Sequence, residues 1–85
     1  MDIRQIRYFV AVAEERNIGR AAKRLFISQP PLTRQIQQLE DELQVKLFER
    51  TAKGVELTSA GQLFLNESRN ILSLIEQAQE RTQRA

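Results

Sequence analysis

The stretch SQPPLTRQIQ, residues 28–37, decides the fold of this chain of 85 residues. From Leu32 onward the apolar residues return at steps of four, three and four, which is the spacing of one face of an α-helix. The two prolines fit the first turn of such a helix, where backbone N–H groups have no helical partner. The pattern predicts a helix from about Pro30 to Leu43 that buries Leu32, Ile36, Leu39 and Leu43.

The opposite face of this helix carries no acid and presents Pro30, Thr33, Arg34 and Gln37. Arg and Gln side chains read base edges with paired hydrogen bonds, and a Thr methyl or Pro ring can touch a thymine methyl. If Ser28 is the N-cap, the prolines leave it no N–H to cap at the usual positions. Its hydroxyl is then free to donate to a phosphate. The face is typical of a helix that lies in a DNA groove.

The charge distribution supports the same reading. The net charge is only +2, but five cations and no acid lie between Arg16 and Leu39. Three of them, Arg20, Lys23 and Arg24, fall on the outer face of a preceding helix and are candidate phosphate neighbours. A basic island in a nearly neutral domain favours a polyanionic partner. A merely solvated basic face is the alternative, and charge by itself does not separate the two.

Several function classes are disfavoured by composition. The chain has no Cys and no His, which removes thiol nucleophiles, zinc thiolate sites and the commonest general base. No apolar run is long enough for a membrane span, and Met1-Asp2 does not begin a signal peptide. We therefore expect a cytoplasmic protein that is no enzyme and needs no cofactor. A helical docking module without a specific DNA role is the competing hypothesis.

Two helices are predicted before residue 28. The first, Ile3 to Glu15, has a core stripe of Ile6, Phe9, Val10 and Ala13, with Tyr8 and Val12 to one side on a second surface. The second, Arg20 to Phe26, turns Ala21, Ala22 and Leu25 inward, with Gly19 as its N-cap. The four phenylalanines, Phe9, Phe26, Phe48 and Phe64, are expected in the core or an interface.

After Leu43 the period changes from helix to strand. Val45 to Arg50 and Val55 to Leu57 read as two short strands, and Thr51 to Gly54 has the composition of a turn. Together they predict a small hairpin, or wing. Arg50 can contact DNA there, or it can pair with Glu49 or Glu56.

A long helix is predicted from residue 59 to residue 85, capped by Thr58 or Ser59. It would span roughly 40 Å, longer than such a domain is wide. Its apolar stripe therefore needs a partner helix, most simply that of a second copy. The residues expected at this dimer interface are Tyr8, Val12, Phe64, Ile71, Leu74, Ile75 and Ala78.

Five segments together resemble the DNA-binding domain of a LysR-type transcriptional regulator. They are residues 6–14, residues 20–25, the run from Ser28 to Ile36 with Leu39-Glu40, Leu47-Phe48-Glu49-Arg50, and Leu57-Thr58-Ser59-Ala60-Gly61. The resemblance covers essentially the whole chain. It implies a mainly α fold: a winged helix-turn-helix of three helices plus a two-stranded wing in residues 1–58, then a dimerising linker helix in residues 59–85.

The resemblance also implies function and partners. It implies binding of double-stranded operator DNA at a pseudo-palindrome, as a homodimer that forms a tetramer in the full-length protein. A small-molecule effector would act only through a C-terminal domain that lies outside this chain. The run from Gln29 to Gln35 further resembles regulators of aromatic-compound catabolism.

The resemblance carries site residues over by position. Gln29, Pro30, Thr33 and Arg34 match the major-groove contacts of the family, and Gln37 joins them from its place on the same face. Arg50 and Lys53 match the base and tip of the wing, while Arg20, Ser28 and Pro31 are expected at the DNA backbone. Two positions depart from the family pattern. Gln44 replaces a Gly that would ease a left-handed turn, and Gly19 replaces a commoner Ser or Thr cap.

Overall fold

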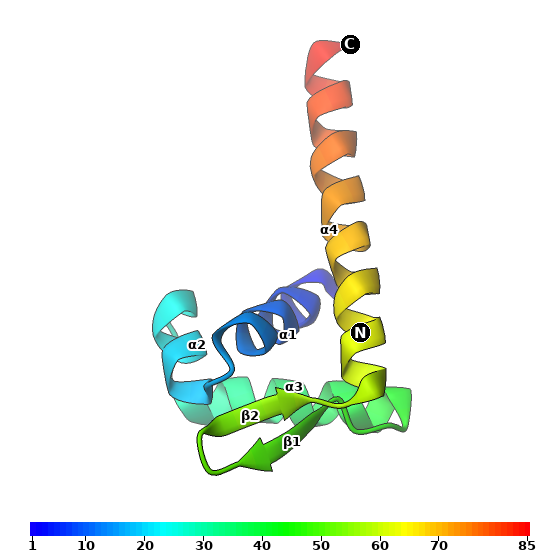
Figure 1. Cartoon of the computed structure of the whole chain (residues 1–85). Helices are drawn as coiled ribbons and strands as arrows, with labels where there is room; N and C mark the ends of the chain where they lie inside the picture. The colour runs from blue at the N-terminus through cyan, green and yellow to red at the C-terminus, as the bar shows by residue number, and fades with distance from the viewer.

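Four helices and one β-hairpin make up the chain, and the computed structural model describes all of residues 1–85. The elements are α1 (Ile3–Glu15), α2 (Ile18–Leu25), α3 (Gln29–Leu43), β1 (Phe48–Thr51), β2 (Gly54–Leu57) and α4 (Ser59–Arg84). The predicted order is confirmed, and α1 has the predicted bounds. Figure 1 shows the hairpin lying across α3 while α4 rises away from both.

The core forms around α1, which packs against α2, α3, α4 and β2. Its predicted stripe of Ile6, Phe9, Val10 and Ala13 is buried. The ring of Phe9 lies between those of Phe48 on β1 and Phe64 on α4, with centroid distances of 5.3 and 5.0 Å and tilted planes. Tilted aromatic pairs at this spacing add to the free energy gained by burial. The wing and the long helix are thus both anchored on one residue of α1.

The prediction that Val12 lies to one side of the core stripe, on a second surface, is wrong. Val12 is fully buried, because five consecutive residues of α1, Phe9–Ala13, are covered by the surrounding elements. Tyr8 and Phe64 are half-buried and pack against the same core. A helix at the centre of a small domain is covered on more sides than its apolar stripe indicates.

The start of α2 also differs from the prediction. Asn17, and not Gly19, is the N-cap: its side-chain oxygen accepts a hydrogen bond from the Arg20 N–H at 2.9 Å. Asn is a stronger cap than Gly, so the helix begins two residues earlier in sequence than the glycine indicated. Gly19 lies inside the first turn, where a Cβ would meet Asn17 Oδ1 at 3.2 Å and Gln29 Nε2 at 3.3 Å.

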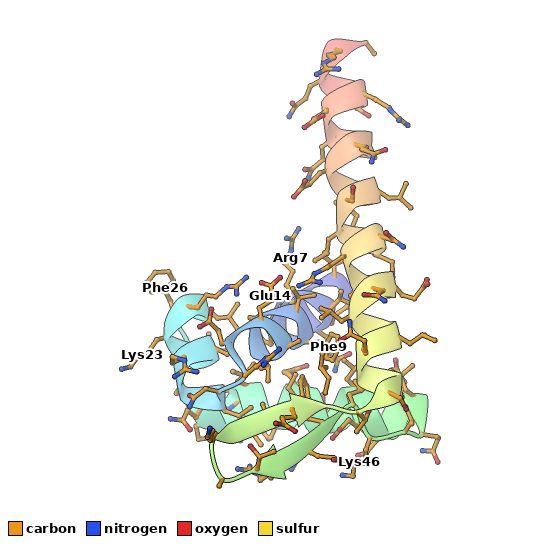
Figure 2. All side chains as sticks on the ribbon, viewed as in Figure 1. Arg7, Phe9, Glu14, Lys23, Phe26 and Lys46 are labelled. Carbon is orange, nitrogen blue, oxygen red and sulfur yellow. The ribbon has the colours of Figure 1, made fainter.

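Phe26 is not a core residue. It follows the last residue of α2 in a left-handed conformation with φ of 58°, and 94 % of its surface is exposed. Figure 2 shows Phe26 and Lys23 pointing outward from this end of the molecule. The turn to α3 needs a left-handed residue at this position, and that backbone geometry directs the ring away from the core.

The first strand is shorter than predicted and begins at Phe48 rather than Val45. Phe48 pairs with Leu57 and Thr51 with Gly54 in an antiparallel register. Gln44 ends α3 in the left-handed conformation, with φ of 57°, that its position was expected to need. Gly54 has φ of 138°, and a Cβ there would collide with the carbonyl oxygen of Arg16. Only glycine therefore lets the wing lie this close to the end of α1.

The last helix begins with Thr58 as its N-cap, which decides between the two candidates: the Thr58 hydroxyl accepts from the Gly61 N–H at 3.0 Å. Only the first turns of α4 are buried, at Gly61, Leu65 and Ser68. The remainder projects from the body, which gives the molecule extents of 49 × 26 × 20 Å (Figure 1). None of the four helices combines the length and apolar character that a membrane span requires.

Candidate nucleic-acid interface

The tip of α3 presents unused hydrogen-bonding groups. Ser28 is the N-cap but makes no side-chain capping bond, as the two prolines predicted, and Pro30 and Pro31 occupy the first turn. Ser28, Gln29 and Pro30 are exposed, while Pro31 is half-buried. The prolines lock the backbone of the first turn while removing its N–H donors. The result is a rigid tip whose free polar groups are side chains.

The outer face of α3 continues this arrangement along the helix. Arg34 and Gln37 are exposed and Thr33 is half-buried. None of these side chains forms a hydrogen bond or ion pair within the chain, so the donors of the Arg34 guanidinium are all available. The inner face is fixed by Leu32, Ile36 and Leu39, which are 0–6 % exposed. Buried residues on one side thus hold unpaired donors in position on the other.

Gln35 lies between these two faces and is held from α1. The side chain of Gln5, 7 % exposed, donates from Nε2 to the Gln35 carbonyl oxygen at 3.1 Å and to Gln35 Oε1 at 3.2 Å. A buried amide that is satisfied in this way fixes the rotation of α3 against α1. The role of Gln5 could not be predicted from the sequence, because Gln near the start of a helix is commonly exposed.

The wing supplies two further free cations. Arg50 and Lys53 are exposed, and Arg50 forms no ion pair with Glu49 or Glu56. The hairpin is tied to the body by a hydrogen bond from the Val55 N–H to the Arg16 carbonyl oxygen at 3.1 Å. An open groove of about 470 Å³ separates the wing from the first turns of α2 and α3, and Arg50, Lys53 and Gln29 line it. Its two cations suit a phosphodiester strand.

Glu40 fixes the wing to α3, a role that could not be predicted from the sequence. The Glu40 side chain is 10 % exposed, and its Oε2 accepts from the Leu47 N–H at 2.7 Å and the Phe48 N–H at 3.3 Å. One carboxylate therefore satisfies the backbone where β1 begins, which is why Leu47 belongs to no strand. The one indication in the sequence was that Glu40 follows Leu39 in a segment that resembles the family.

The basic island is smaller in space than in sequence. Arg24 pairs with Glu14 at 2.8 Å and with Glu15 at 3.2 Å, and Arg20 donates to the Glu15 carbonyl oxygen at 2.9 Å. These acids lie outside the acid-free stretch but fold back against it. Arg24 is largely neutralised, and Arg20 is partly engaged although its side chain remains 62 % exposed. Of the five cations in the island, Arg16, Lys23 and Arg34 form no ion pair, and Arg50 and Lys53 of the wing are unpaired as well.

The residues expected at a dimer interface divide into two groups. Leu74, 63 % exposed, and Ala78 lie on the projecting part of α4, with Ile71 and Ile75 half-buried beside them. Tyr8, Val12 and Phe64 pack in or against the core of the chain itself. Sequence spacing placed Phe64 on one stripe with Ile71 and Ala78, because α4 continues without interruption from the body into solvent.

The comparisons with known proteins agree with this architecture. Residues 3–62 match the model of the bacterial regulatory helix-turn-helix proteins of the lysR family. The chain is 59 % identical to the transcriptional regulator TfdT of Cupriavidus pinatubonensis and 60 % identical to ClcR of Pseudomonas putida. Both alignments cover all of this chain and 37 % and 29 % of the relatives. The chain thus spans about a third of the length of the regulators that it matches.

Solved structures match over nearly the whole chain. One is the crystal structure of the CbnR_DBD–DNA complex, with 52 % identity and a TM-score of 0.93, covering 98 % of this chain and 95 % of that one. Another is the complex of BenM_DBD with benA site 1 DNA, with 45 % identity and a TM-score of 0.95, covering 99 % and 98 %. On the match of sequence and fold together, the chain belongs to the lysR family of bacterial regulatory helix-turn-helix proteins.

Proposed function

We propose that this chain is the sequence-specific DNA-binding domain of a LysR-type transcriptional regulator. The observation that carries the proposal is the outer face of α3, where Gln29, Thr33, Arg34 and Gln37 have no partner in the chain while the inner face is locked into the core. Unpaired Arg and Gln side chains on a rigid helix are the groups that read base edges. The similar CbnR and BenM domains were crystallised with DNA, which supports the assignment.

Within this proposal the residues divide by role. Gln29, Pro30, Thr33, Arg34 and Gln37 contact base edges in the major groove. Arg20, Ser28 and Pro31 lie at the DNA backbone on one side of α3, and Arg50 and Lys53 lie there on the other. Base contacts supply sequence discrimination, while phosphate contacts supply affinity and its dependence on salt.

We propose that two copies bind together through residues 59–85, with residues 1–58 as the DNA-binding body. The exposed Leu74 and Ala78 on a helix that projects from the body support this division. Two-fold symmetry would then place the two α3 helices at successive major-groove faces of a pseudo-palindrome. We expect the full-length protein to be a cytoplasmic tetramer. A small molecule would control it by binding to a domain that lies outside this chain. Among the subgroups of the family, we favour the regulators of aromatic-compound catabolism.

Selection of bound sites from a random duplex pool tests the proposal. We expect an enriched sequence with two related half-sites, and mobility-shift titration should show binding to it that is at least about 10³-fold tighter than to unrelated duplex. The alternative, a helical docking module, predicts no enrichment and little duplex affinity at any salt concentration. Recovery of unrelated sequences at the same affinity would refute specific binding.

A further inference from the structure

Glu14 joins three helices at the side of the molecule away from the wing tip. Its Oε1 accepts a hydrogen bond from Nη2 of Arg24 on α2 at 2.8 Å, and its Oε2 accepts from Nη2 of Arg69 on α4 at 3.0 Å. The pair of Glu14 with Arg69 is the one ion pair that connects α4 to the rest of the chain. The bond from Arg24, followed by that from Arg69, lowers the pKa of the Glu14 carboxyl, so the group is charged at neutral pH.

Apolar packing also holds α4 to the body. Phe64 packs on Phe9 at 5.0 Å, Leu65 is buried in the core, and Leu72 packs against that core further along the helix. Glu14 and Arg69 each lie five residues beyond the aromatic pair on their helices, which is a rise of about 7.5 Å. The ion pair therefore lies between Leu65 and Leu72 along α4. It adds a directional polar bond that also reaches α2 through Arg24.

Apolar packing does not cover this ion pair on the side that faces the wing. The side of α4 that faces the wing borders an open cleft of about 660 Å³, lined by Glu14, Arg69, Arg16, Glu56 and Gln62 among others. The side chains of Glu14 and Arg69 are 33 % and 52 % exposed, so changing them removes no core packing.

We propose that Glu14 is a positioning residue that fixes the direction in which α4 leaves the DNA-binding body. This inference rests on the proposed function, in which α4 joins two copies. In such a dimer the direction of α4 sets the distance between the two α3 helices. Glu14 thereby determines which spacing of half-sites the dimer prefers, although it lies off the DNA-reading face.

A distance measurement within the dimer tests this directly and needs no DNA. The chain has no native Cys, so Ala52→Cys at the wing tip gives a single labelling site. Pulsed dipolar spectroscopy of the spin-labelled chain should give one narrow distance across the dimer. Glu14→Gln should broaden or shift that distance, and Arg69→Gln should do the same. Glu15→Gln is the matched control, because Glu15 pairs only with Arg20 and Arg24 of α2.

DNA binding supplies the second measurement. With the selected operator, Glu14→Gln should leave affinity for a single half-site within twofold of the parent. Its preference for the native spacing over a spacing changed by two base pairs should fall by about fivefold, in the lower range of coupling between sites. Glu15→Gln should keep that preference.

The outcomes separate the two proposals. An unchanged distance distribution and an unchanged spacing preference in both the Glu14 and the Arg69 variants would overturn the positioning role. Equal loss of single-site and double-site affinity would also overturn it, because the residue would then act on the body alone. If the parent chain shows no dipolar distance or no selected operator, the dimer or the DNA-binding function itself fails.

Discussion

The outer face of α3 and the junction of α1, α2 and α4 both carry exposed polar side chains, but they use them in opposite ways. At the α3 face, Arg34 and Gln37 have no partner in the chain. At the junction, Arg24 and Arg69 both bond to Glu14. Charges that are satisfied internally fix the architecture, whereas unsatisfied donors on a rigid surface remain available for a ligand. Sequence charge patterning cannot separate the two, since Arg24 and Arg34 lie in the same acid-free stretch of the sequence.

Glu40 is the main exception to this comparison. It lies on α3, but its carboxylate accepts hydrogen bonds within the chain and so supports the fold. Glu40→Ala leaves the Leu47 and Phe48 N–H groups without an acceptor, and we expect a loss of about 2–3 kcal/mol of unfolding free energy. Chemical denaturation of the variant checks this. Glu40→Gln keeps one oxygen acceptor and should lose less than half as much. Equal losses in the two variants would show that the hydrogen bonds are not the cause.

Arg34→Ala is the corresponding change among the free donors. Stability should stay within about 0.5 kcal/mol of the parent, as for an exposed residue without partners. Operator affinity should fall by about 1–3 kcal/mol, with relaxed preference at one base position. Mobility-shift titration on the operator and its single-base variants measures both effects. A variant that binds the operator as tightly as the parent does would exclude α3 as the reading element.

Lys53→Ala distinguishes phosphate contacts from base contacts within the proposed DNA-binding surface. A wing-tip cation that neutralises a phosphate contributes affinity without sequence preference, so binding to all duplexes should weaken to a similar extent. The slope of log affinity against log salt should decrease in magnitude by about 1. Titrations at several salt concentrations, on operator and unrelated duplex, give the slope. A loss confined to the operator would place Lys53 at a base edge.

Elements with a strong local signal were predicted well. The steps between Leu32, Ile36 and Leu39 identified α3, and the double proline identified the free Ser28 cap. The signals that failed concern contacts over long sequence distances. Val12 is buried because α1 is surrounded, and β1 begins late because a carboxylate from α3 takes the first N–H groups of that segment. Neither fact is encoded in a local period.

The same reasoning explains the errors in the charge analysis. Arg24 lies in an acid-free stretch, yet its partners are ten and nine residues away, on the preceding helix. Arg69 lies 55 residues from Glu14. The packing of α1 against α2 and α4 brings such charges together, and only the fold determines which of them remain free.

Substitution of Ser68 tests the junction, because this residue of α4 carries a buried polar group without a partner. Its side chain is fully buried in α4, and its hydroxyl has no hydrogen-bond partner. Ser68→Ala removes this unsatisfied group and should stabilise the chain by about 0.5–1 kcal/mol. Ser73→Ala is the control, because that exposed residue shares the gain in helix propensity and loses only the solvent-exposed bond that its hydroxyl accepts from Gln77 at 3.2 Å. A Ser68 variant that is no more stable than the control would mean that the hydroxyl finds a partner in solution.

The smallest effect is expected from the ion pairs of Glu14 in acid. Bonds from Arg24 and Arg69 outweigh burial and lower the pKa of the folded carboxyl from its ordinary value of 4.5. A lowered pKa means that the folded state holds the proton less tightly than the unfolded chain does. The associated stability is therefore fully present above about pH 4.5 and is lost as the pH falls through the folded value.

Comparing the parent with Glu14→Gln at a series of pH values isolates this contribution. The parent should be more stable at neutral pH, by under about 1 kcal/mol because the pairs are partly solvated. The difference should shrink toward zero below the folded pKa, where the parent carboxyl is protonated as well. A difference that stays constant from neutral to acid pH would mean that shape, and not charge, holds Glu14 to its two arginines. The junction would then differ from the α3 face in packing alone.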